Sequence, residues 1–225
     1  MKKRMHKCFL QRQSATSWCL AFAFFILLCN PVLGQYPGYS AVANMTSFRE
    51  QFKTGSGTVL SIQSTFTQEK ILTALTEKIT SSGKFWFKRS NKVRIEYIKP
   101  FFYLMVLNGD KMLVRDDQKE NRINVKSNKL FQQVNRIMMD CVQGTILDSK
   151  DFETKVFESE KTYLLEMTPS SKGLREFFQT IVLIVGKKDF AANSIEMNEP
   201  SGDKTTILFT DKKLNTEISD AVFAL

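Results

Sequence analysis

Histidine and cysteine, the side chains that most often carry catalysis or bind metals, gather at one end of this 225-residue sequence. The only histidine is His6, and three of the four cysteines are Cys8, Cys19 and Cys29. Beyond residue 34 the only cysteine is Cys141. That content cannot form a Ser-His-Asp triad, a Cys-His pair or an ordinary zinc site. We therefore expect no catalytic residue, no metal and no cofactor, and a protein that is not an enzyme.

The other residues that could do chemistry have simpler interpretations. Cys141 falls on the apolar face of a predicted helix without a basic partner, which favours a buried thiol over a nucleophile. Asp116 and Asp117 are typical of a solvated turn rather than of a paired catalytic site. A hydrolase that uses a serine-lysine pair stays open as the less favoured alternative, because that chemistry needs no histidine.

The N-terminal segment has the pattern of a secretion signal. Residues 1–34 carry five Lys or Arg and no Asp or Glu, and an apolar run from Trp18 to Cys29 follows the basic flank. The run is short for a membrane anchor. Val32 and Gly34 stand where a signal peptidase requires small residues, so the mature chain should begin near Gln35. We predict a signal peptide over residues 1–34 and one exported domain over residues 35–225.

The charge and size of the mature chain limit its partners. Removing the five cations of residues 1–34 lowers the formal net charge from +9 to +4, which takes away the main support for nucleic-acid binding. The 191 residues left of the 225 suit one domain with a substantial core. Cys141 has no partner for a disulfide, so we expect a monomer. From the low net charge we expect no binding to nucleic acid.

Most of the mature sequence has the two-residue alternation of strands. The clearest cases are residues 60–67, 83–89, 93–97 and 111–115, and the later ones are 154–157, 163–168, 177–185, 194–199 and 204–210. Residues 70–80 fit a helix or a strand, and their threonines favour a strand. Residues 101–107 are apolar on both faces, and Asn108-Gly109 predicts a type I′ hairpin turn.

Two segments interrupt the strands as helices. Asn44 can cap a helix that carries Phe48 and Phe52 on one face and ends at the glycines near residue 55. A second, amphipathic helix begins at Asn128 and ends at Gly144. About ten antiparallel strands with one or two helices predict an α+β domain built on a strongly curved antiparallel sheet.

Four motifs follow one another at consistent spacing. They are Ser64-Thr65-Phe66-Thr67-Gln68, Gly83-Lys84-Phe85-Trp86-Phe87-Lys88-Arg89, Arg94-Ile95-Glu96-Tyr97 before Pro100, and Asn108-Gly109-Asp110-Lys111. In this order the mature chain resembles the periplasmic outer-membrane lipoprotein carrier family, LolA. The second half agrees in its order of elements, a helical insertion followed by paired strands. One departure is Ser90, which stands where the family usually has proline.

The resemblance implies an unclosed β-barrel, or half-barrel, capped by helices. It also implies a periplasmic chaperone that holds lipoprotein acyl chains in an apolar cavity and ferries lipoproteins from the inner to the outer membrane. Its partners would be acylated lipoproteins as cargo, an inner-membrane lipoprotein-releasing transporter, and an outer-membrane receptor or the outer membrane itself. An acyl chain of about fifteen methylenes gains on the order of 12 kcal/mol on burial, so a soluble carrier must offer a matching apolar surface.

The same resemblance assigns roles to particular residues. The acyl-chain cavity would be lined by Phe66, Phe85, Phe87, Ile95, Tyr97, Met105 and Leu107. The lid over it would carry Phe131, Val134 and Met138, and Arg89 would lock that lid. Two interpretations stay open at this point. These apolar residues could form an ordinary core, or the scaffold could serve as a lipid-sensing envelope-stress domain.

Overall fold

The structure is a computed structural model that describes residues 36–75, 77–127 and 129–225, with the side chains of 129–131 and 134 left undescribed. The predicted signal peptide, residues 1–34, lies outside the described residues. The chain divides into two units, Met1–Pro37 and Gly38–Leu225, and the second contains every described helix and strand. Among the described residues, no helix is long and apolar enough to cross a membrane.

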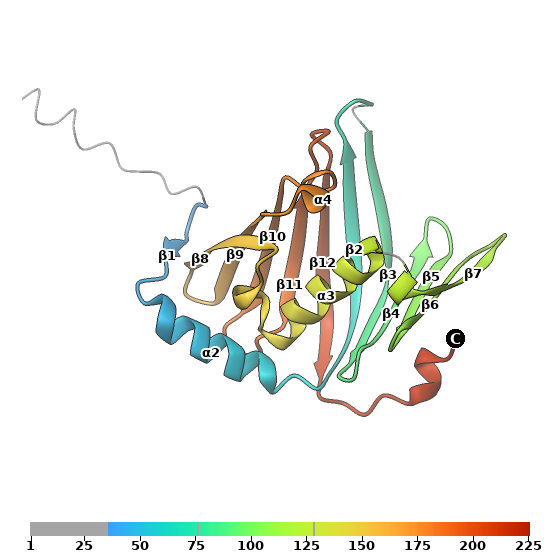
Figure 1. Cartoon of the computed structure of the whole chain (residues 1–225), viewed down its shortest axis with the longest axis horizontal. Coiled ribbons are helices and arrows are strands. Elements are labelled where there is room, and N and C mark those ends of the chain that lie inside the picture. The colour runs from blue at the N-terminus through green and yellow to red at the C-terminus, as the bar shows by residue number, and fades with distance from the viewer. Residues whose placement is uncertain (1–35, 76, 128) are drawn as a thin grey trace, which may run out of the picture. The chain divides into compact units, whose positions relative to one another are not determined.

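The second unit is built on one sheet of twelve described strands, all paired antiparallel (Figure 1). The strands are β1 Ser40–Ala41, β2 Ser61–Leu72, β3 Glu77–Lys88, β4 Lys92–Lys99, β5 Tyr103–Asn108, β6 Lys111–Asp116, β7 Glu120–Asn124, β8 Phe152–Glu158, β9 Thr162–Pro169, β10 Thr180–Gly186, β11 Ala192–Asn198 and β12 Lys204–Leu214. Their order is β1-β8-β9-β10-β11-β12-β2-β3-β4-β5-β6-β7. Because β1 and β7 are edges that do not pair with each other, the barrel is unclosed, which confirms the predicted fold class.

Helices cover one face of this sheet. They are α2 Met45–Gly57, α3 Lys129–Gln143 and the short α4 Lys172–Arg175, with 3-10 turns at η1 Val125–Ser127 and η2 Ile146–Asp148. A third 3-10 turn, η3 Asp220–Phe223, lies on the opposite face. Figure 1 shows α3 crossing in front of the central strands. Ile137 and Cys141 of α3 pack on the core of β8–β10, whereas Met139 packs on the core of β3–β6. One helix can contact both halves only if the sheet curves around it.

The alternation along β2 explains which face is covered. Ile62, Ser64 and Phe66 are buried on the inner face, which is the face toward α3. Thr67, the next residue along the strand, is exposed. Phe66 is paired with Gly83 of β3, where a Cβ would lie 2.1 Å from the carbonyl oxygen of Glu96. Gly83 therefore allows a close approach of β3 and β4 that any side chain would block.

Helix α2 begins and ends close to its predicted bounds. Asn44 caps it as expected, because its Oδ1 accepts a hydrogen bond from the Ser47 amide at 3.0 Å. The helix passes Gly55 and ends at Gly57, the second of the two glycines expected to end it. A Cβ on Gly55 would lie 2.3 Å from the ring of Phe190, so this glycine serves close packing of α2 against the β10–β11 turn.

Three local features differ from the patterns expected from the sequence. The β5–β6 hairpin turns on Gly109 and Asp110, since Asn108 pairs with Lys111, and only Gly109 has a positive φ, the pattern of a type II′ turn. Strand β7 follows the turn at Asp116, where the sequence pattern had predicted no strand. Ser90 has φ of 89°, which proline cannot adopt, so the departure from the family at this position has a backbone reason.

The chain after β12 crosses back over the outer face of β3–β6. Ile218 and Phe223 are buried there against Leu104, Val106 and Leu113. Lys88 donates to the Ile218 carbonyl at 2.9 Å and pairs with Asp220 at 2.7 Å. This C-terminal segment makes the β3–β6 half of the sheet two-sided, with apolar packing on both faces.

Candidate ligand-binding cavity

An apolar cavity of about 260 Å³ lies between the inner face of the sheet and α3. The sheet contributes side chains from both of its halves, and α3 contributes the opposite wall. The lining residues are Val59, Ile62, Ser64, Phe66, Phe85, Ile95, Tyr97, Ile137, Met138, Cys141, Val142, Met167, Phe178, Ile181, Leu183, Val185, Phe190, Ala191, Ala192, Ile195, Met197, Ile207, Phe209 and Lys212. Such a cavity can hold an apolar ligand, and few of the side chains that line it are polar.

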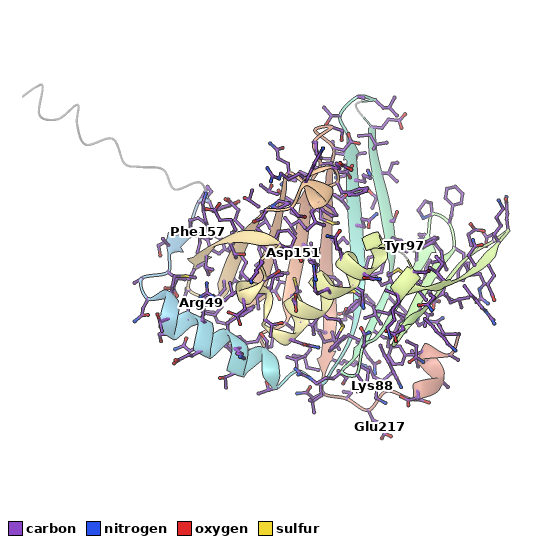
Figure 2. All side chains as sticks on the ribbon, in the orientation of Figure 1. Arg49, Lys88, Tyr97, Asp151, Phe157 and Glu217 are labelled. Carbon is purple, nitrogen blue, oxygen red and sulfur yellow. The ribbon has the colours of Figure 1, made fainter. Side chains whose placement is uncertain are left out.

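Four of the seven side chains expected at the cavity line it, namely Phe66, Phe85, Ile95 and Tyr97. The ring centroids of Phe66 and Tyr97 lie 5.0 Å apart. The Tyr97 hydroxyl donates to Oε1 of Gln68 at 2.8 Å, and Figure 2 labels this tyrosine, which belongs to β4. Burial, and then the nearby Tyr103, raises the pKa of Tyr97, so its phenol stays protonated and remains a donor.

The other three, Phe87, Met105 and Leu107, do not line the cavity. Phe87 is fully buried and Leu107 nearly so, in a core cluster that Met139 of α3 and Val59 complete. Met105 packs against the same cluster. All three lie on the inner face, as their alternation predicts, but α3 descends onto the sheet at this point and fills the space above them. Strand alternation identifies a face, and it does not show where along the strand the covering element makes contact.

Met138 is the one expected lid residue whose side chain is described, and it lines the cavity. Phe131 and Val134 belong to the same helix, and their side chains lie outside the described part of the structure. Cys141, one turn further along α3, also lines the cavity. Burial, and then Asp140, raises the pKa of the Cys141 thiol to about 12, so it remains a neutral part of an apolar wall.

One end of the cavity is polar, a feature that the sequence analysis missed. Lys212 is the one charged side chain among the described residues that line it. Its Nζ lies 2.7 Å from Oδ2 of Asp189 and 2.6 Å from Oδ1 of Asn193. Ser64 lines the cavity as well, and its buried hydroxyl has no hydrogen-bond partner in the described part of the chain. The charged run Asp211-Lys212-Lys213, just after the predicted strand and near the end of β12, is the sequence signal for these polar groups.

Residues 57–225 match the family model described as outer membrane lipoprotein carrier protein LolA. The chain belongs to the LolA family. A curated outer-membrane lipoprotein carrier protein from Methylibium petroleiphilum is 29% identical over 120 residues, which cover 53% of this chain and 54% of that protein. The match thus spans about half the length of that relative.

Two solved structures also align with most of this chain, at low sequence identity. A LolA superfamily protein from Nitrosomonas europaea is 12% identical and aligns with 82% of this chain and 99% of its own, with a TM-score of 0.43. A chain of the MucA/MucB complex of Pseudomonas aeruginosa is 11% identical and aligns with 80% of this chain and 60% of its own, with a TM-score of 0.48.

The arginine that the LolA resemblance assigns to a lid contacts α2 rather than α3. Arg89 donates from Nη2 to the Ser56 carbonyl at 3.0 Å, and from Nη2 and Nε to the Val59 carbonyl at 3.1 and 3.2 Å. Among the described residues it forms no bond to α3. Ser56 in turn lies against the end of α3, because a Cβ on Gly144 would meet the Ser56 Cβ at 2.7 Å. Arg89 therefore touches the helical cover through the last turn of α2.

Its neighbour Lys88 points to the other face and has a different partner. Lys88 binds Ile218 and Asp220 of the C-terminal segment (Figure 2). The hydrogen bond from Lys88, and then one from Lys92, lowers the pKa of Asp220. The sequence indicated opposite faces for Lys88 and Arg89, and it could not show that each one fastens a different segment to the sheet.

Proposed function

We propose that this chain is a periplasmic carrier that binds the acyl chains of lipoproteins in the cavity under α3 and ferries lipoproteins from the inner to the outer membrane. Membership of the LolA family supports the class of cargo. The observation that carries the proposal is the cavity itself, whose wall is apolar on the sheet side and on the α3 side. Its partners would be an inner-membrane transporter that releases lipoproteins and an outer-membrane receptor or the outer membrane itself.

The size of the cavity bears on how cargo would enter. At about 260 Å³ it falls just below the range of about 300–1,000 Å³ that is usual for ligand pockets. A loaded carrier would therefore need α3 to move outward. Each methylene that enters gains about 0.8 kcal/mol, which counts against the cost of the helix packing that is lost. Such a design keeps the apolar surface covered when no cargo is bound.

A matched pair of substitutions on β4 tests the proposal. Ile95 lines the cavity, whereas Ile98 is 48% exposed three residues later on the same strand. Ile95→Asp places a carboxylate against the apolar wall, where it must protonate or bring water with it. We expect at least about tenfold weaker binding of a fluorescently labelled acylated peptide, since burying an unpaired polar group costs more than 1.4 kcal/mol. Ile98→Asp should bind like the wild type.

Two results would overturn the proposal. The first is equal binding by wild type and by a correctly folded Ile95→Asp variant, with circular dichroism as the check on folding. The second comes from mass spectrometry of the protein purified from its native compartment. Acylated proteins should co-purify with it, and recovery of free phospholipid alone would favour a lipid carrier or a lipid sensor instead.

A further inference from the structure

A β-bulge turns Lys212 into the cavity. In the pairing of β12 with β2, Thr210 lies opposite Thr65 and Lys213 opposite Gln63, so Asp211 and Lys212 together face Ser64. Asp211 has a φ of 52°, the left-handed conformation that such bulges use. Its carboxylate accepts a hydrogen bond from the Thr65 hydroxyl at 2.8 Å, which holds the irregular backbone in place. The extra residue shifts the alternation, and Lys212 joins the inner face.

Two neighbours hold the Lys212 ammonium, and one of its hydrogens stays free for a ligand. Asp189 and Asn193 accept two of its three N–H bonds at 2.7 and 2.6 Å. The third has no protein partner in the described part of the chain, and the side chain is only 16% exposed. Little water reaches this group, so a ligand atom beside it would interact through a low local dielectric.

Ser64 supplies a second donor on the same stretch of wall. The residue is 7% exposed, and its Oγ is buried without a hydrogen-bond partner among the described residues. A buried hydroxyl that stays unpaired costs about 1–3 kcal/mol, so such groups in native proteins usually meet a partner. Ser64 faces the bulge that carries Lys212, and both line one cavity. A ligand that brings an acceptor oxygen to this place would satisfy both.

The local charge decides what kind of oxygen that is. Lys212 already forms an ion pair with Asp189, so the site as a whole is neutral. A carboxylate would add an unpaired negative charge beside an apolar wall, which is strongly unfavourable. A neutral carbonyl accepts the same two hydrogen bonds without that cost. The site is therefore suited to an acyl chain whose carbonyl is part of an ester or an amide.

We propose that Ser64 and Lys212 form a carbonyl subsite that selects ester- or amide-linked acyl chains over free fatty acids. This inference rests on the proposed function, because it requires acyl chains to enter the cavity. It adds a chemical preference within that class of ligand. In this view Asp189 sets the preference by neutralising Lys212, and Asn193 positions the ammonium.

Displacement of the neutral fluorescent dye Nile red from the purified protein tests the subsite. The competitors share one chain length and differ at the end: methyl dodecanoate, N-methyldodecanamide, dodecanoate and dodecane. We expect wild type to bind the ester and the amide about tenfold or more tightly than dodecane, the effect of about one charge-assisted hydrogen bond. It should also bind them more tightly than dodecanoate, whose charge would stay unpaired. Ser64→Ala and Lys212→Met should each lose the advantage of the ester and the amide over dodecane and leave the affinity for dodecane itself unchanged.

Two further variants make the test specific. Lys213→Met changes the neighbouring, exposed lysine and should behave like wild type. Asp189→Asn keeps the shape and leaves the Lys212 charge unpaired, so the preference should shift toward dodecanoate, a change that a merely structural role would not produce. Wild type that binds all four competitors equally, or a Lys212→Met variant that still binds the ester more tightly than dodecane, would overturn the subsite alone. Failure of every competitor to displace the dye would overturn acyl binding itself, and with it the proposed function.

Discussion

Arg89 offers the sharpest test of how the helical cover is held. Its guanidinium spans two carbonyls, that of Ser56 in the last turn of α2 and that of Val59 just beyond it. The Ser56 carbonyl belongs to the last turn of α2, where carbonyls lack an intrahelical partner, and it also accepts a hydrogen bond from the Val59 amide at 3.1 Å. Ser56 packs against the end of α3 at Gly144, so α2, α3 and the end of β3 meet at this point. We propose that these bonds stabilise the closed cover and are weakened when cargo opens it.

The magnitude follows from the contacts. A hydrogen bond to a charged group contributes about 1.5–3 kcal/mol net, and partial exposure of Arg89 places the effect at the lower end. Arg89→Leu removes the bonds that favour the closed state and adds apolar surface. The loaded state then gains about 1.5 kcal/mol relative to the empty one, which corresponds to about tenfold slower or less complete release. Arg89→Lys keeps the charge without the planar fork and should fall between the two.

The assay is transfer of a fluorescent acylated protein from the purified, loaded carrier to outer-membrane vesicles. Arg122→Leu makes the same substitution on β7, at a side chain that is 67% exposed, and should transfer like wild type. Lys88→Leu is unsuitable as a control, because Lys88 anchors the C-terminal segment. If Arg89→Leu folds correctly and releases cargo at the wild-type rate, Arg89 has no part in closing the cover and serves only to cap α2.

Alanine at the two glycines of α2 should have opposite effects on stability in urea unfolding. Gly55→Ala should lower the free energy of unfolding by about 1–3 kcal/mol, because its Cβ would press into the Phe190 ring. Gly57→Ala meets open space and should raise the free energy of unfolding by up to about 1 kcal/mol, and equal effects of the two would contradict this packing. Cys141, with a pKa near 12 instead of 9, should react with iodoacetamide at pH 8 about 1,000-fold more slowly in the native protein than in urea. Comparable rates would show that the cavity wall opens freely, and denaturation should restore normal reactivity.

The elements of this fold could be predicted from the sequence because sheet residues alternate. Phe85 and Ile95 fall on the inner face by simple period-two counting, and the structure places them there. The helix that ends at Gly144 follows from its three- and four-residue spacing, and the glycine has the positive φ of a C-terminal cap. In each case the local pattern and the tertiary packing favour the same conformation.

The finer features depend on contacts between residues far apart in sequence. Phe87 has the same pattern as Phe85, but Phe87 is sealed in a core cluster that includes Val59 and Met139, while Phe85 lines the cavity. Lys212 reaches the inner face through an irregular pairing of β12 with β2, which no alternation predicts. Gly55 looks like a helix stop until Phe190 is seen packed against it.

The junction of β2 with β12 also constrains when the cavity can form. Phe66 pairs with Phe209, so the floor of the cavity joins segments more than a hundred residues apart in sequence. Contacts of such high sequence separation form late in folding, because the loop between them must first close. As the chain emerges end first from the ribosome or a translocation channel, β2 and β3 can pair early, yet their inner face stays open to water until β12 arrives. During that interval the surface meant for the ligand is the one most exposed to aggregation, and a holding factor or rapid completion of the chain would protect it.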